Sequence, residues 1–248
     1  MVSAHELCDV AVLTRTILRP SLLTAIRSIF RQDYSRPIQI LIGVDAVEDG
    51  SGLIATLREE CPPSMQLDVI DIGYSTSRKR GGLYPNACGG ALLVLLAYAA
   101  HARHILFLDD DNWAAPDHVG ALRASVEGFD WAFTLRWFVD GASGKTLCVD
   151  EWESVSPGRG VFAGRAGAYV DTNCLILNKI TCHFAIPHLA LAMTADGNGE
   201  DRVLSEYLLR NHSVGWTDRP TVYYAIRPDD RMYPMRRQWM ALRGVMAP

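Results

Sequence analysis

The sequence predicts an α/β fold in which a mostly parallel central sheet is flanked by helices. In the first half of the chain, β-rich apolar runs alternate with segments of helical periodicity, which is typical of parallel strands joined by helices. Acidic residues follow two of the expected strands, at Asp45 and Asp109. Because ligands bind at the carboxyl ends of parallel strands, these acids mark the expected binding edge of the sheet.

The first half of the chain is expected to hold four strands and three helices. The strands are expected at residues 9–15, 38–45, 65–73 and 105–108. The helices are expected at residues 21–32, 53–60 and about 86–101, because their apolar side chains recur at helical spacing. A turn is expected at residues 48–52, and a polar loop, residues 74–86, precedes the third helix.

The second half is less regular. A helix is expected at residues 116–126, strands at 131–139 and 170–179, a hairpin turn at 141–146 and a glycine-rich loop or flap at 150–170. An amphipathic helix is expected at 200–211, and the basic, aromatic tail at 231–246 is interpreted as a final packing helix, with a membrane-surface helix as the alternative. Without an internal repeat or a linker, residues 1–248 are expected to form a single domain.

Composition narrows the class of protein. The formal net charge of −4 argues against nonspecific binding of nucleic acid, which usually needs a basic surface. The six cysteines are scattered without a CxxC pair, which fits a reducing cytoplasm better than a disulfide framework or a zinc site. No signal peptide is visible in the first 20 residues, and the most apolar run, residues 91–100, is too short to span a bilayer. A cytoplasmic location is therefore expected.

The segment "HILFLDDDNW" places three carboxylates at the end of a buried strand: Asp109, Asp110 and Asp111. Like charges at such close spacing repel one another unless a cation or hydrogen bonds compensate. Carboxylate oxygens suit Mg²⁺ or Mn²⁺, which normally share their remaining positions with water and substrate phosphates. The segment therefore predicts a metal–diphosphate site. The alternative is that the acids only cap the helix that begins near Pro116.

A second acidic pair begins the helix at residues 200–211. In helical geometry Asp201, Leu204 and Leu208 lie on one face, so the carboxylate is on the side that packs inward. Burial and the neighbouring Glu200 would raise the pKa of Asp201 and make it a better base, whereas Arg202 would act the other way. The alternative is an ordinary acid in the first turn of a helix.

Two other segments carry weaker candidates. The loop "GYSTSRKRGG" offers hydroxyl groups and cations, Arg78 and Arg80 among them, which could hold phosphate or simply form a solvated turn. Trp152 and Glu153 could face a sugar on the acceptor side, and Asp171 is a further acceptor-side candidate. The alternative for Trp152 is a packing anchor.

These motifs, in this order, resemble the family 2 glycosyltransferases with the GT-A fold. "VAVLTRTILRPSLLTAIRSIFRQDY" is similar to the opening strand and helix of that family, and "IQILIGVD" to its second strand. "LFLDDDNWAAPDHV" resembles the DXD segment, and "GEDRVLSEYLL" the acidic ED motif of inverting members. The usual "DDGS" is replaced by "DAVEDGSG", and the loop after the third strand departs from the common pattern. The resemblance covers about residues 9–211.

The resemblance implies a role for each candidate residue. Asp111 would ligate the metal, Mn²⁺ or Mg²⁺, with Asp109 contacting the ribose or the metal and Asp110 supporting both. Asp201 would be the catalytic base, and Glu200 would orient the acceptor or share that role. The remaining implied donor-site residues, for the base and the phosphates, are Asp45, Thr14, Arg15 and Arg78.

The resemblance also implies an activity. A sugar would pass with inversion from a nucleoside diphosphate, UDP favoured and dTDP or GDP open, to a hydroxyl of a sugar, glycan, lipid-linked or small-molecule acceptor. Residues 1–112 would bind the nucleotide, and residues 113–248, with a smaller antiparallel part, the acceptor. The sequence predicts no nucleic-acid partner and leaves open both a homodimer and contact with the inner membrane face.

Three alternatives are kept from other classes. A phosphatase or phosphotransferase of the haloacid-dehalogenase type also has DxD after a strand, but near its N-terminus and followed by a threonine where this chain has Trp113. A nucleotidyltransferase should open with a glycine-rich phosphate loop, and "VAVLTRTILRP" contains no glycine. A non-catalytic relative would bind nucleotide sugar without turnover.

Overall fold

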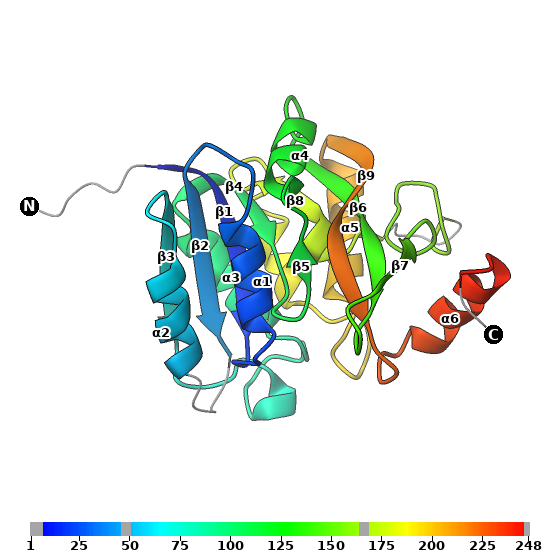
Figure 1. The fold of residues 1–248 in the computed structure, drawn as a ribbon, viewed down its shortest axis with the longest axis horizontal. Helices are drawn as coiled ribbons and strands as arrows, with labels where there is room; N and C mark the ends of the chain where they lie inside the picture. The colour runs from blue at the N-terminus through cyan, green and yellow to red at the C-terminus, as the bar shows by residue number, and fades with distance from the viewer. Residues whose placement is uncertain (1–6, 46–50, 164–168, 246–248) are drawn as a thin grey trace, which may run out of the picture.

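The computed structural model describes residues 7–45, 51–163 and 169–245, and within them nine strands form one continuous sheet (Figure 1). The sheet order is β3-β2-β1-β4-β8-β6-β9-β5, with β7 paired to β6. The strands are β1 (Cys8–Thr16), β2 (Ile38–Val44), β3 (Met65–Asp71), β4 (Ala102–Phe107), β5 (Trp113–Ala114), β6 (Trp131–Asp140), β7 (Thr146–Val149), β8 (Leu175–Asn178) and β9 (Val214–Ile226).

The direction of pairing divides the sheet into two parts. Strands β3, β2, β1 and β4 run parallel to one another. Strand β8 is antiparallel to both β4 and β6. Strand β7 pairs antiparallel with β6, and β5 pairs antiparallel with β9, whereas β6 and β9 are parallel to each other. The predicted α/β class, a mostly parallel sheet with a smaller antiparallel part, is confirmed. The division into a single domain with two functional halves stays a prediction.

Helices cover both faces of the sheet. They are α1 (Leu22–Phe30), α2 (Ser51–Glu60), α3 (Gly90–Ala99), α4 (His118–Ser125), α5 (Glu200–Asn211) and α6 (Tyr233–Leu242), with 3₁₀ turns η1 (Arg78–Arg80), η2 (Thr172–Cys174) and η3 (Ile186–Ala190). Alternate residues of β1 face opposite sides: Val10 and Val12 join the core under α1, α2 and α4, whereas Ala11 and Leu13 join the core with α3 and α5. Each fully buried large apolar side chain contributes roughly 1.5–3 kcal/mol to this packing.

The structure corrects the sequence interpretation in the second half. The strand expected at residues 170–179 begins only at Leu175, because the Asp171 side chain accepts a hydrogen bond from the Asn173 backbone and starts the η2 turn. The 13-residue strand β9 was not predicted. It contains Pro220, which lies opposite an irregularity in β6, and charged residues break its apolar alternation. The turn expected at residues 48–52 lies mostly outside the described residues.

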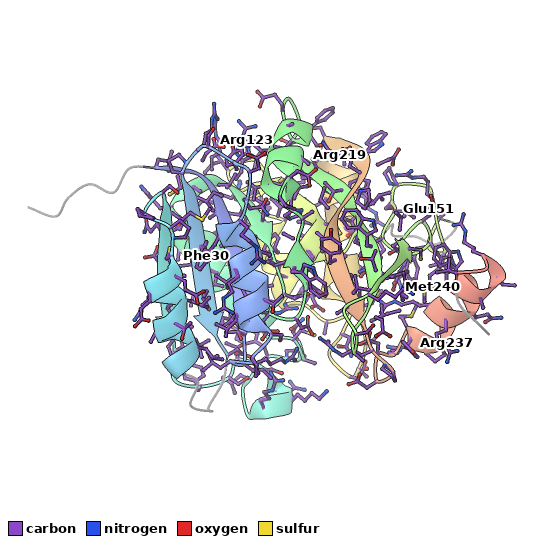
Figure 2. All side chains as sticks on the ribbon, viewed as in Figure 1. Phe30, Arg123, Glu151, Arg219, Arg237 and Met240 are labelled. Carbon is purple, nitrogen blue, oxygen red and sulfur yellow. The ribbon has the colours of Figure 1, made fainter. Side chains whose placement is uncertain are left out.

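The tail forms the packing helix that the sequence predicts. Met240 of α6 is fully buried against Phe138 and Ile226, at the end of the molecule opposite α2 (Figure 2). Of the helices in the described part of the chain, none is long and apolar enough to cross a membrane. None of the six cysteines, all of which lie in the described part of the chain, forms a disulfide bond.

Candidate active site

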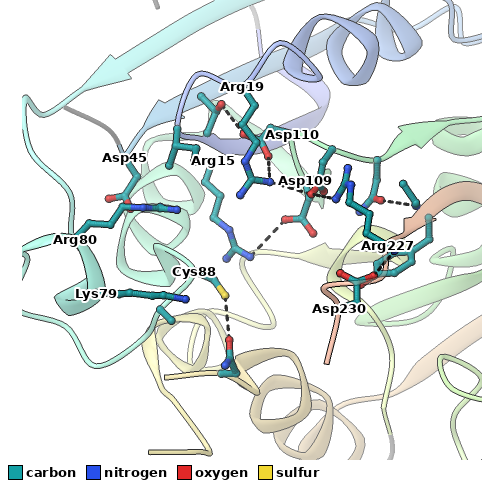
Figure 3. Close-up of a pocket in the computed structure, with 18 residues that line it drawn as sticks. Arg15, Arg19, Asp45, Lys79, Arg80, Cys88, Asp109, Asp110, Arg227 and Asp230 are labelled. Atoms are coloured by element: carbon teal, nitrogen blue, oxygen red, sulfur yellow. Dashed lines mark hydrogen bonds and ion pairs between the residues drawn. The ribbon is translucent and has the colours of Figure 1, made fainter. Parts of the chain in front are cut away.

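A cavity of about 300 Å³ lies at the carboxyl ends of the parallel strands (Figure 3). The chain runs outward from β1 to β2 and β3 and then returns to β4 on the other side of β1. The strand order therefore reverses between β1 and β4, which is where open α/β sheets form ligand-binding crevices. The residues at the ends of these two strands line the cavity: Arg15, Thr16, Ile17 and Arg19 at the end of β1 and after it, and Asp109 to Asn112 after β4.

The three acids of the DDD segment do not share one environment. Asp109 is held by Asn173, whose Nδ2 donates to Oδ2 at 2.8 Å and whose Oδ1 accepts from the Asp109 backbone at 2.6 Å. Asp110 is buried and accepts from the Thr16 hydroxyl at 2.7 Å. Asp111 is partly exposed and contacts two arginines, Arg19 and Arg227. Donors on each carboxylate thus offset the like-charge repulsion, and Arg19 is shared between Asp110 at 3.4 Å and Asp111 at 2.9 Å.

Burial shapes the protonation of these acids. It raises the pKa of Asp109 to about 6, with Arg15 opposing and with Asp111 and Asp171 adding to the rise. Burial likewise raises the pKa of Asp110, against the lowering effects of Arg19 and the Thr16 hydroxyl. Carboxyls of this kind favour a cation beside them, because a positive charge stabilises their ionised form.

Five cationic side chains line the same cavity: Arg15, Arg19, Lys79, Arg80 and Arg227. In Figure 3, Lys79 and Arg80 enter from one side and Arg227 from the other, with Arg15 between them. Arg15 Nη2 is 3.4 Å from both Asp109 Oδ1 and Glu200 Oε1. Burial alone would lower the pKa of Arg15, but Asp109 and Glu200 outweigh it and the pKa rises, so this cation stays charged.

The loop of residues 74–86 places cations at the cavity, but Arg78 is not one of those in the described lining. Arg78 is exposed and is absent from the cavity lining among the described residues, whereas Lys79 and Arg80 line it. The turn is tight: an added Cβ on Gly82 would lie 2.4 Å from the carbonyl oxygen of Ser75. In the 3₁₀ turn η1 the two residues after Arg78 thus face the cavity, and the sequence of the loop does not reveal this geometry.

Asp45 and Thr14 have structural positions: Asp45 is hydrogen-bonded to the loop after β3, and Thr14 is buried. Asp45 lines the cavity but anchors the loop, since its carboxylate accepts from the Ser75 hydroxyl at 3.0 Å and from the Thr76 backbone at 2.6 Å. Thr14 is fully buried in β1 and is not among the described residues that line the cavity, whereas Thr16 is. A direct contact from Asp45 to a nucleotide base stays a prediction.

Glu200 and Asp201 lie beside the cavity at the start of α5. Gly199, with φ of 93°, gives the turn that begins the helix, and Glu200 is buried against Arg15. Burial, Glu200 and Asp171 raise the pKa of Asp201 to about 8, against hydrogen bonds from the Arg202 backbone and the Tyr169 hydroxyl. A carboxyl with this pKa is a far stronger base than an ordinary aspartate.

The three acceptor-side candidates have structural partners. Trp152 stacks on Trp239 with ring centroids 6.1 Å apart, which is the packing role given above as the alternative. Glu153 and Asp171 are buried ion-pair partners of Arg136, and Glu153 also pairs with Arg236 at 2.8 Å. None of the three is in the cavity lining within the described chain. Their acceptor role stays a prediction.

Asn173 links this buried ion-pair network to the cavity. Its Nδ2 donates to both Asp109 Oδ2 at 2.8 Å and Asp171 Oδ1 at 2.6 Å. Sequence reasoning missed Asn173, along with the cavity cations Arg19 and Arg227. For Asn173 a signal existed in the "DTN" triplet, because Asp and Asn two residues apart often form a side-chain-to-backbone turn.

The carboxylates at the cavity are of the chemical type that binds a divalent cation. Mg²⁺ binds through one or two carboxylates plus substrate phosphates, and Asp109 and Asp111 supply two hard oxygen ligands at the cavity. Among the described residues no cluster of three or more His, Cys, Asp or Glu could hold a metal by itself. A metal at this site would therefore need substrate oxygens to complete its shell.

No protein-family model and no curated protein sequence matches the chain. Several solved structures are similar to the chain. S. aureus TarS matches with 12% identity and a TM-score of 0.62, and the match covers 94% of this chain and 39% of TarS. TarS 1–349 in complex with UDP-GlcNAc matches at 11% identity and a TM-score of 0.62, with 94% and 66% covered.

The mannosyltransferase PcManGT from Pyrobaculum calidifontis, in complex with GDP-Man and Mn²⁺, matches at 12% identity and a TM-score of 0.59, with 94% of this chain and 61% of that chain covered. The chain thus spans between two fifths and two thirds of the length of these structures. The comparison establishes that this protein has the GT-A-like fold of glycosyltransferases.

Proposed function

We propose that this protein is a glycosyltransferase that moves a sugar from a nucleoside diphosphate to an acceptor hydroxyl with inversion. The observation that carries the proposal is the cavity at the β1/β4 switch point, whose described lining contains five carboxylates, Asp109 to Asp111 among them, and five cations. Such a mixture suits a metal-bridged diphosphate, which offers negative oxygens to arginine and lysine and shares a cation with the carboxylates. The complexes of the structural neighbours with UDP-GlcNAc and GDP-Man support a nucleotide sugar as donor.

The donor half of the proposal uses the residues of the cavity. Asp109 and Asp111 would hold Mn²⁺ or Mg²⁺, and the cation would neutralise charge that develops on the departing diphosphate. Lys79, Arg80 and Arg227 approach from opposite sides and would bind phosphate oxygens. UDP is the favoured nucleotide, with GDP and dTDP as the alternatives.

The acceptor half of the proposal assigns proton removal to Asp201. Its raised pKa of about 8 suits a general base that takes a proton from a hydroxyl group. Glu200, whose carboxylate contacts Arg15, would keep the pKa of Asp201 raised and would orient the acceptor. Direct attack of the hydroxyl on the anomeric carbon then inverts the configuration at that carbon. Cysteines without disulfide bonds in the described part of the chain fit action in a reducing compartment such as the cytoplasm.

The experiment that tests the donor site is a calorimetric screen of UDP, GDP, dTDP and CMP, each with and without Mn²⁺. We expect one nucleoside diphosphate to bind and Mn²⁺ to tighten its binding. If none of the nucleotides binds under either condition, the proposal is wrong. If a nucleotide sugar binds but is neither transferred to any acceptor nor hydrolysed, the protein is instead the non-catalytic relative.

Asp111→Ala is expected to weaken nucleotide binding in the presence of Mn²⁺ by at least about tenfold, because a metal ligand is lost. Without Mn²⁺ the same variant should bind nucleotide no more weakly than the wild type. Titration calorimetry measures both affinities. Asp117→Ala is the matched control, since Asp117 is an exposed acid that pairs with Arg219 and neither residue is in the described lining of the cavity.

A further inference from the structure

Asp111, one of the two proposed metal ligands, is already held by two arginines from distant parts of the chain. Arg227 Nη1 lies 2.8 Å and Arg19 Nη1 2.9 Å from the same oxygen, Asp111 Oδ2. Arg19 comes from the loop after β1, and Arg227 follows β9 directly. We call this pair of contacts the Asp111 latch.

The backbone on each side of the latch is fixed. Arg19 follows Leu18, whose φ of 63° is uncommon for a residue other than glycine, and the Leu18 amide donates to the Thr16 hydroxyl at 2.8 Å. The Arg227 amide donates to Asp230 Oδ2 at 2.8 Å. The ends of both side chains have room to move, since Arg19 is 43% and Arg227 35% exposed. The loops thus aim the arginines at the cavity while the guanidinium groups can change partners.

A divalent cation that binds at this site without a diphosphate would meet an obstacle. It must take an oxygen of Asp111 while two positive guanidinium groups contact the same carboxylate, and like charges at this spacing repel. A diphosphate removes the obstacle, because its oxygens accept the hydrogen bonds of both arginines bidentately and leave Asp111 to the cation. The cation and the diphosphate then each make the other's binding easier.

We infer that Arg19 and Arg227 exchange Asp111 for the diphosphate when the donor binds, so that metal and nucleotide binding are positively coupled. This inference rests on the proposed donor site and adds a device that sets the order of binding. The protein on its own holds Mn²⁺ weakly, and the diphosphate recruits it. By thermodynamic linkage, Mn²⁺ must tighten the diphosphate by the same factor.

The test measures Mn²⁺ binding to the free protein by electron paramagnetic resonance, and UDP binding by calorimetry without Mn²⁺ and at saturating Mn²⁺. In the wild type we expect Mn²⁺ to tighten UDP by about tenfold or more, within the usual range of coupling between sites. The variant is Arg227→Met, which removes the charge but keeps the backbone amide that contacts Asp230.

Arg227→Met is expected to bind Mn²⁺ several-fold more tightly than the wild type in the absence of UDP, and to show a smaller coupling factor. A merely structural role for Arg227 would not improve metal binding. Arg219→Met is the matched control and should change neither quantity, since Arg219 pairs with Asp117 and neither residue is in the described lining of the cavity. Thermal melts establish that both variants are folded.

The outcomes separate the inference from the function on which it rests. If UDP, GDP and dTDP all fail to bind, the proposed donor site and the latch are both wrong. If a nucleotide binds with the same affinity at zero and saturating Mn²⁺, or if Arg227→Met binds Mn²⁺ no better than the wild type, the latch is wrong and the donor site stands.

Discussion

Asp201→Asn is expected to lower kcat for sugar transfer by about 10²- to 10⁴-fold, the usual contribution of a general base. The amide keeps the size of the side chain but cannot accept the proton of the acceptor hydroxyl. Nucleotide affinity should stay within about twofold of the wild type, because Asp201 lies outside the described lining of the cavity. Steady-state kinetics and calorimetry measure the two effects separately.

The matched control for this variant is Glu206→Gln on the same helix. Glu206 is an acid that pairs with Arg210 one turn further on and lies away from Asp201 in the helix. It should keep full activity. Equal loss of activity in the two variants, or retention of activity in Asp201→Asn, would show that Asp201 is not the base.

The pH dependence of the same residue has a definite sign. Burial, Glu200 and Asp171 raise the pKa of Asp201 to about 8, so the basic form accumulates as the pH rises through about 8. We expect kcat to rise over that window and then level off. An activity that is flat from pH 6 to 9 would contradict this assignment.

Folding stability should change in the opposite direction. Because the pKa of Asp201 is higher in the folded state than in the unfolded chain, the folded state binds the extra proton, and the stability that this contributes is lost as the pH rises from about 4 to about 8. Asp201→Asn cannot ionise and should therefore lose less stability than the wild type between pH 6 and 8. Thermal melts across this range, beside the Glu206→Gln control, measure the difference.

Arg136→Met is expected to lower the free energy of unfolding by about 3–5 kcal/mol, the usual cost of leaving buried charges unpaired. Arg136 is fully buried in β6 and donates to three carboxylates, Asp150 at 2.9 Å, Glu153 at 2.8 Å and Asp171. Methionine fills a similar volume but leaves Asp150 and Asp171 without this cation. Urea denaturation followed by fluorescence measures the change.

Arg136→Lys tests why an arginine is present. One ammonium group is a point charge and cannot reproduce the planar fork that reaches three carboxylates, so a partial loss of stability is expected. Arg159→Met serves as the control: Arg159 is partly exposed and pairs with Asp218 near the surface, where an ion pair contributes about 0–1 kcal/mol. A loss of less than 1 kcal/mol in Arg136→Met would contradict the proposed importance of the network.

The same network also bears on the proposed site. Asp171 contacts Arg136 on one side and Asn173 on the other, and Asn173 holds Asp109 through two hydrogen bonds. Asn173→Ala should therefore weaken metal-dependent nucleotide binding by roughly tenfold or more, as loss of a hydrogen-bond partner of a metal ligand commonly does. Calorimetry with and without Mn²⁺ measures it. An unchanged affinity would show that Asp109 needs no such support.

Much of the fold could be predicted because its signals are local. The parallel strands of the first half are nearly continuous apolar runs, and the helices between them have helical spacing, so element type follows from periodicity. The helix at residues 200–211 was predicted with the bounds that the structure gives. Strand β9 could not be, because Pro220 and charged residues break its pattern and its pairing with β6 is non-local.

The site divides in the same way. Asp45, Asp109, Asp110 and Asp111 could be assigned to one edge because acids that follow parallel strands meet there by topology alone. Arg227 could not be assigned, since 116 positions separate it from Asp111 and only the return of β9 brings them together. Glu153 and Asp171 were assigned to an acceptor side, whereas the buried cation Arg136 gives them partners.

The sequence by itself determined the α/β class, the order of most elements and the edge of the sheet at which acids gather. These features depend on hydrophobic periodicity and on residues adjacent in the chain. Only the tertiary structure decided which charges meet: Arg19 and Arg227 on Asp111, and Arg136 among three buried carboxylates. The reason is physical, because the partner of a charge is set by distance in space and by shielding from water, and neither can be read from neighbours in the sequence.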